Sequence, residues 1–147
     1  MTGRIMGIGH VALKVHDLER SLAFYRDKLG FPEMMRMDHP DGGVWLVYLR
    51  ITDSQFIEIF PGAENERSPG WSGNAITHVC LEVDDLEAVV DQVEKAGIKL
   101  LIEKKTAADG NRQAWIEDPD GNRIEFMQLD PNSLQLQAIA RLRAEGV

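Results

Sequence analysis

The sequence predicts an α+β fold of two tandem βαβββ modules whose sheets form one curved, mixed-sheet trough. An internal repeat is the first observation: residues 10–19 (HVALKVHDLE) and 78–87 (HVCLEVDDLE) are identical at seven of ten positions. The second is a period of two in apolar residues at the start of each repeat, which is typical of a half-buried strand. The third is length, since 147 residues suffice for about one ordinary domain and its core.

The first module is expected to span residues 5–60. A strand is predicted over residues 8–15, where apolar side chains occupy every second position. A helix follows, capped by Asp17 and ended by Gly30. Three more strands complete the module, because turn signals rich in aspartate and glycine break the remaining apolar segments.

The second module is expected over residues 75–129 and repeats the same order. Its first strand is predicted over residues 76–83, and its helix begins after Asp85 and ends at Gly97. Three strands separated by Asp-Gly and Asp-Pro turns follow. Because the two halves share one plan, corresponding residues are expected to occupy corresponding places.

Two segments lie outside the modules. Residues 61–74 are predicted to be a linker, and residues 130–147 a tail that contains a helix. The apolar residues of this tail could pack on the same chain or on a partner chain, and the sequence leaves both possibilities open.

The composition argues against several classes of binding partner and of protein. Sixteen basic residues stand against twenty-four acidic ones, and this net charge of −8 argues against a nucleic-acid-binding surface. No run of 18 apolar residues indicates a membrane span, and the polar N-terminal residues argue against a signal peptide. The single cysteine, Cys80, excludes an internal disulfide. We therefore expect a soluble, cytoplasmic protein.

Four side chains are predicted to share the sheet face that points away from the helices. They are His10, Glu58, His78 and Glu125. Strand alternation turns them away from their apolar neighbours, and each His–Glu pair recurs at nearly the same spacing in both halves. Buried carboxylates need partners, and a divalent cation would satisfy all four groups at once. This ligand set suits zinc, nickel, cobalt, manganese or iron.

Several motifs carry a specific resemblance. HVALKVHDLERSLAFYRDKLGF, the mid-chain FIEIF, ITHVCLEVDDLE and the late EDPDGNRIEF resemble the vicinal oxygen chelate superfamily (glyoxalase, bleomycin resistance and extradiol dioxygenase proteins) over residues 5–129. Within it, the pattern is most similar to glyoxalase I (lactoylglutathione lyase) proteins. The resemblance implies a homodimeric metalloenzyme that binds its metal through His10, Glu58, His78 and Glu125.

The same resemblance implies a reaction. The substrate would be an adduct of a 2-oxoaldehyde and a thiol, or a similar molecule with two neighbouring oxygen atoms. Glu125 would move a carbon-bound proton to the neighbouring carbon through a metal-stabilised enediolate, and Glu58 would remain a ligand or share this task. The expected activity is that of a lyase or isomerase.

Two positions depart from the glyoxalase I pattern. Lys14 stands where that family has an arginine, and Gly62 where it has an asparagine. Because the lysine ammonium is a point charge and lacks the planar, two-pronged guanidinium of arginine, glutathione recognition is expected to be altered. The candidate substrate-binding residues are Lys14, Trp71 and Trp115.

Other functions of the same fold stay open. An extradiol dioxygenase would hold iron on His10, His78 and Glu125. An epimerase would use two opposed bases around a metal. A non-catalytic small-molecule-binding protein of the bleomycin-resistance type would generally lack the ligand set.

Overall fold

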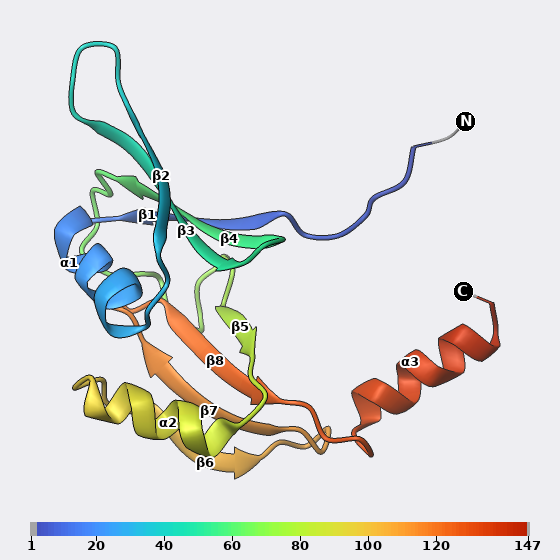
Figure 1. Cartoon of the computed structure of the whole chain (residues 1–147). Coiled ribbons are helices and arrows are strands. Elements are labelled where there is room, and N and C mark those ends of the chain that lie inside the picture. Colours follow the sequence, from blue (N-terminus) through green and yellow to red (C-terminus); the bar gives the residue numbers. More distant parts are fainter. Residues whose placement is uncertain (1–2, 147) are drawn as a thin grey trace. The chain divides into compact units, whose positions relative to one another are not determined.

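The computed structural model describes residues 3–146, which divide into two compact units. Unit 1 comprises Met1–Ser68 with Pro119–Gly121, and unit 2 comprises Pro69–Asp118 with Asn122–Val147. Each unit contains one four-stranded mixed sheet and a helix that follows the first strand (Figure 1). The predicted α+β fold with two tandem βαβββ modules is confirmed.

In unit 1 the strand order is β1-β4-β3-β2. Strand β1 pairs in parallel with β4, whereas the other neighbours are antiparallel. The elements are β1 (His10–Val15), α1 (Leu18–Leu22), η1 (Ala23–Lys28), β2 (Glu33–Asp38), β3 (Val44–Thr52) and β4 (Gln55–Pro61).

In unit 2 the order is β5-β8-β7-β6, again with one parallel pair, β5 with β8. The elements are β5 (His78–Glu82), α2 (Leu86–Lys95), β6 (Ile102–Thr106), β7 (Arg112–Glu117), β8 (Arg123–Gln128) and α3 (Leu134–Ala144). In both units the first and last strands of the repeat lie side by side at the parallel pair. No helix within residues 3–146 has the length and apolar character that a membrane crossing requires.

The helices begin where the sequence predicts. Asp17 accepts a hydrogen bond from the Arg20 backbone N–H at 3.0 Å, and Asp85 accepts one from that of Ala88 at 3.1 Å. Each helix packs against the apolar side of its own sheet, and the core side chains come from both layers. They include Leu22, Tyr25, Leu49 and Ile59 in unit 1, and Leu86, Val90, Ile116 and Ile124 in unit 2. The other face of each sheet carries polar residues of the alternation, among them Glu58 in unit 1 and Glu125 in unit 2.

The first helix differs from a regular α-helix. After α1, the chain continues as a π-helical segment in which Leu29 N–H donates to the Phe24 carbonyl, five residues earlier, at 2.9 Å. The adjacent aromatic side chains of Phe24 and Tyr25 are both buried in this segment. Apolar periodicity alone predicts a helix here and does not distinguish the two forms.

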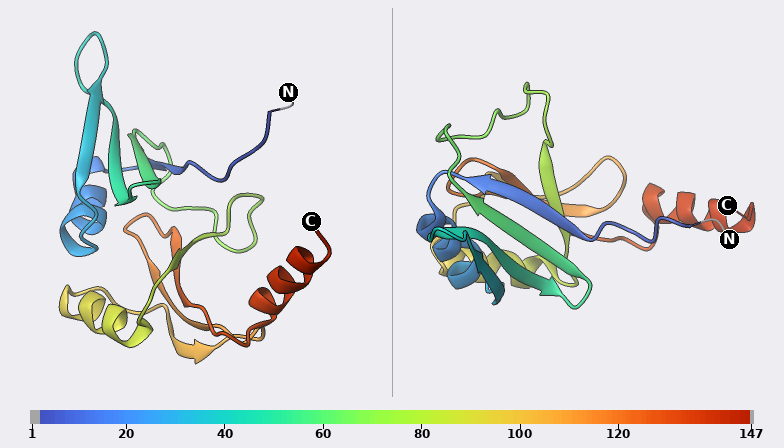
Figure 2. Two further views of the ribbon diagram at one scale, coloured as in Figure 1. Left: turned by 45° about the vertical axis from the view of Figure 1, so that its right-hand side comes forward. Right: turned by 90° about the horizontal axis from the view of Figure 1, so that it is seen from above.

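The tail forms the predicted helix, α3, capped by the Ser133 hydroxyl. None of its residues is buried, and Leu134 is 61% exposed. Figure 2 shows α3 standing clear of the β5–β8 sheet of its unit. Its attachment runs through Asn111, which is 1% exposed and donates through Nδ2 to Gln135 Oε1 at 3.1 Å.

Replacing Asn111 with alanine is expected to lower the free energy of unfolding by about 2–4 kcal/mol. The Asn111 amide also donates to Asp109 and accepts from the Asp130 backbone N–H, both at 3.0 Å. The alanine variant would therefore leave several buried polar groups without a hydrogen-bond partner. Urea unfolding measures the effect. Asn74→Ala, at an exposed asparagine, is the matched control and should change stability little; equal effects of the two changes would contradict the prediction.

A charged cluster on unit 2 predicts a pH effect on stability. Glu87 on α2 accepts hydrogen bonds from Arg112 and Lys104, which hold the pKa of Glu87 below its usual range. The stabilisation is therefore present above the unfolded-state pKa and is lost as pH falls through the folded-state pKa. Glu87→Gln is expected to destabilise the protein at pH 7 and not at acid pH, as followed by thermal unfolding. Glu66→Gln, at an exposed loop residue, should show no such pH-dependent difference.

Candidate functional site

One His–Glu pair lies on the sheet of unit 1. His10 on β1 places Nε2 3.2 Å from Oε2 of Glu58 on β4. The register of the parallel pair explains this, because Glu58 lies opposite Ala12, one side-chain repeat along the strand from His10. Glu58 is 8% exposed, between the buried Ile57 and Ile59. The sequence alternation thus correctly predicts that His10 and Glu58 share a face.

Tyr48 also belongs to this pair, although the sequence analysis missed it. It lies on β3 opposite Glu58, and its ring meets that of His10 edge to face with centroids 5.8 Å apart. A hydrogen bond to the Glu58 carboxylate is the main reason why the pKa of Tyr48 lies above its usual range. The signal that could have found Tyr48 is its central place in the strand that precedes the glutamate strand.

The second pair lies on the sheet of unit 2. His78 on β5 places Nε2 3.3 Å from Oε2 of Glu125 on β8. The Oγ1 atom of Thr77 lies 2.9 Å from the other ring nitrogen, Nδ1, and so orients the imidazole with Nε2 toward the carboxylate. Glu125 lies opposite Cys80, as Glu58 lies opposite Ala12. The repeat therefore includes the contact between the two side chains: in both units an imidazole Nε2 faces a glutamate Oε2.

Two tryptophans surround His78. The rings of His78 and the buried Trp115 are 4.8 Å apart, and Trp71 lies 6.4 Å from His78 and 5.6 Å from Trp115. Trp71 is 53% exposed and therefore presents much of its surface to solvent. Both residues were candidates for substrate binding, and the structure brings them to the histidine of the second pair.

The thiol of Cys80 is poorly suited to act as a nucleophile, because its pKa is raised. The residue as a whole is exposed, but its thiol lies beside Glu125. Desolvation of the thiol, with repulsion from the Glu125 carboxylate, raises the pKa of Cys80 to about 12. The thiol is therefore protonated near neutral pH, which does not favour a nucleophilic role.

The geometry of each pair suits metal binding. Two ligand atoms about 2.1 Å from an ion and at right angles to each other lie about 3 Å apart. The separations of 3.2 and 3.3 Å are close to this value, and an imidazole with a carboxylate is a ligand pair common to several transition metals. Among residues 3–146, no three His, Cys, Asp or Glu side chains come together as a metal-binding group. The binding of one cation by all four residues stays a prediction.

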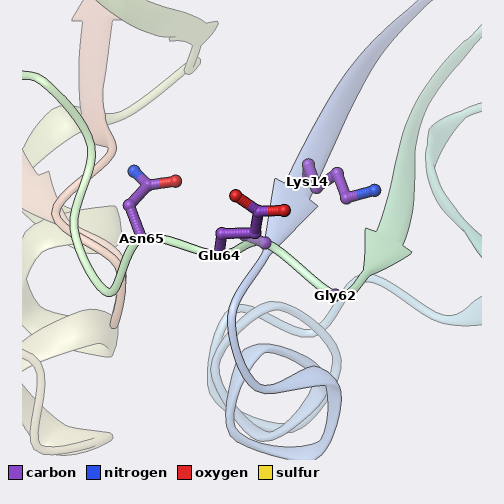
Figure 3. A pocket seen from close by; sticks show the side chains of 5 residues that line it. Lys14, Gly62, Glu64 and Asn65 are labelled. Atoms are coloured by element: carbon purple, nitrogen blue, oxygen red, sulfur yellow. The ribbon is translucent and has the colours of Figure 1, made fainter.

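Lys14 lies on β1, four residues beyond His10 on the same face. It lines an open hollow of about 340 Å³ with residues 62–65. Figure 3 shows its side chain beside that of Glu64, with Asn65 further along the segment and Gly62 just after β4. Gly62 has a φ of +88°, a conformation that favours glycine over the asparagine of the glyoxalase I pattern.

Comparison with known proteins identifies similar chains. A model of the family described as Glyoxalase/Bleomycin resistance protein/Dioxygenase superfamily matches residues 7–126. Lactoylglutathione lyase of Neisseria meningitidis is 35% identical over 127 residues, which cover 84% of this chain and 91% of that protein. The ethylmalonyl-CoA/methylmalonyl-CoA epimerase of Cereibacter sphaeroides is 31% identical over 128 residues, 83% of this chain and 93% of that one.

A solved structure shares the fold over nearly the whole chain. The trypanothione-dependent glyoxalase I of Leishmania major superposes with a TM-score of 0.70 and 25% identity, covering 98% of this chain and 99% of its own. A fold of two tandem βαβββ modules is thus common to both proteins.

Proposed function

The chain belongs to the Glyoxalase/Bleomycin resistance protein/Dioxygenase superfamily, and from this premise we propose that it is a metal-dependent lyase or isomerase of the glyoxalase I type. Its substrate would be a small molecule with two neighbouring oxygen atoms, such as an adduct of a 2-oxoaldehyde and a thiol. The observation that carries the proposal is the repeated His–Glu pair, with separations of 3.2 and 3.3 Å.

Four side chains would hold the metal: His10, Glu58, His78 and Glu125. In each pair the imidazole Nε2 and a carboxylate oxygen face each other, so each pair would offer two ligand atoms to the metal once Nε2 has lost its proton. A zinc, nickel, cobalt, manganese or iron ion would act as a Lewis acid toward the negative charge that develops on a substrate oxygen.

Glu125 is proposed as the base. Its carboxylate would take the proton from the substrate carbon, and the C–H electron pair would move toward the adjacent carbonyl oxygen. The same carboxyl group would then return the proton to the neighbouring carbon, while the hydroxyl proton of the first carbon passes to the oxygen of the second, which completes an isomerisation without an external reactant. Glu58, held by Tyr48, would remain a ligand or share the proton from the other side.

A second candidate is an epimerase, favoured by the similarity to the Cereibacter sphaeroides enzyme. In that reaction one glutamate would remove a proton from the carbon next to a thioester carbonyl, and the other would return a proton to its opposite face. The two carboxylates supply the required pair of bases.

Lys14, Trp71 and Trp115 are proposed to bind the substrate. The two aromatic rings would offer apolar contact beside His78, and the Lys14 ammonium would attract a negatively charged part of the substrate. A homodimer is the proposed working form. The apolar side chains left exposed on the N-terminal segment, at Ile5, Met6 and Ile8, support association of this kind.

Metal analysis of the purified protein, combined with activity measurements, tests the proposed function. The substrates are methylglyoxal with a panel of thiols, and a 2-carboxyacyl thioester of defined configuration. Turnover of a thiol adduct supports the glyoxalase-type reaction, and racemisation of the thioester supports the epimerase. Oxygen consumption with a catechol and ferrous iron would instead identify a dioxygenase, and a metal-free protein that binds a planar drug would identify a sequestering protein.

A further inference from the structure

Arg123 is a largely buried arginine, and two of its donor atoms lack hydrogen-bond partners in the part of the chain that the structure describes. Its side chain is 13% exposed, and Nε and Nη1 are buried without a hydrogen-bond acceptor among residues 3–146. Oε1 of Glu117 lies 4.0 Å from Nε, beyond hydrogen-bond distance. Leaving charged donors buried and unsatisfied is costly, so such a group calls for a ligand.

The surroundings hold the guanidinium group in place. Its Cζ atom lies 4.0 Å from the centre of the Trp71 ring, a cation–π contact. Gly70 brings the backbone against the same group: a Cβ at this position would lie 3.6 Å from Nη2, and the φ of +74° itself favours glycine. Because Trp71 in turn contacts Trp115, the arginine is fixed from one side before any ligand binds.

Arg123 also occupies the sheet face of the second His–Glu pair. It is directly opposite His78 in the parallel β5–β8 pairing. It lies two residues before Glu125 on the same strand, so alternation turns both side chains to one face. A group bound to Arg123 would therefore lie beside the atoms proposed to carry out the reaction.

We propose that Arg123 is a specificity-determining residue that binds a carboxylate carried by the substrate near its reacting carbon. The assignment of the carboxylate to the substrate rests on the proposed function, whereas carboxylate binding at Arg123 does not. A carboxylate matches the site because its oxygens accept hydrogen bonds from separate guanidinium donors while its charge neutralises the arginine. Trp71 acts as the wall that keeps the guanidinium oriented.

Direct binding tests this proposal without relying on turnover. Tryptophan fluorescence of the full-length protein as purified is titrated with succinate, with its neutral diamide succinamide, and with inorganic phosphate. A Trp45→Phe background confines the signal to Trp71 and Trp115. Succinate is expected to bind at least about tenfold more tightly than succinamide. Equal or tighter binding of phosphate would overturn the choice of a carboxylate.

Variants of Arg123 assign the effect. Arg123→Gln is expected to remove the preference for succinate, and Arg123→Lys to restore part of it, because lysine keeps the charge without the planar stack on Trp71. Arg50→Gln, at an exposed arginine paired with Asp53, is the matched control and should leave the preference intact. An unchanged preference in Arg123→Lys and in a folded Arg123→Gln protein would overturn the proposal, as would its loss in the control.

The outcome also separates this inference from the proposed function. Arg123-dependent succinate binding without lyase, isomerase or epimerase activity would retain the binding site and reject the function. If the protein turned over its substrate but the Arg123 variants bound succinate like the wild type, the function would be retained and the site rejected.

Discussion

Glu125→Gln is expected to lower kcat by about 10²–10⁴-fold, the range that general acid–base catalysis contributes. The amide keeps an oxygen that can face His78 and a metal ion, but it cannot accept the substrate proton. The variant should therefore retain much of its metal while losing the reaction. Steady-state kinetics with the substrate turned over by the wild type, together with metal content, measures both effects.

Glu103→Gln is a suitable control for this experiment, because Glu103 is an exposed residue of β6. It should change neither kcat nor metal content. If Glu125→Gln retained full activity, Glu125 would lose the role of base. If Glu58→Gln alone abolished turnover while keeping the metal, the base would be reassigned to Glu58.

His10→Ala and His78→Ala are each expected to weaken metal binding by about 100-fold or more, because each removes one of four ligands that share the binding free energy. Although the two histidines belong to different units, the proposal assigns them to one ion, so either change alone should have the full effect. Competition with a coloured chelator measures the affinity.

His39→Ala is the matched control, because His39 is an exposed histidine. It should bind metal like the wild type. Retention of wild-type affinity in either ligand variant would exclude that histidine from the site.

The main features of the fold follow from local patterns in the sequence. A period of two at Val11, Leu13 and Val15 predicts both the first strand and the face on which His10 lies, because alternation is a strict consequence of strand geometry. Asp17 and Asp85 predict the helix starts because their carboxylates cap free backbone N–H groups. The internal repeat then extends each interpretation to the other module.

The sequence predicts the His–Glu pairs of the site better than it predicts the residues around them. The pairing of His10 with Glu58 follows from alternation once β1 and β4 are neighbours. Tyr48 and Arg123 depend on strand register and on the path of the segment around Trp71, which are set by tertiary contacts between distant residues. The sequence therefore predicts the two His–Glu pairs and misses Tyr48 and Arg123 beside them.

Metal stoichiometry tests the central claim most directly, namely that the two His–Glu pairs serve one cation. The metal per chain is counted by elemental analysis after saturation and removal of unbound ion, for the wild type and for the two histidine variants. The proposal predicts one ion per chain in the wild type and nearly none in either variant, whether the two pairs come from one chain or from two copies. Two ions in the wild type with one remaining in each variant, or no bound ion at all, would contradict it.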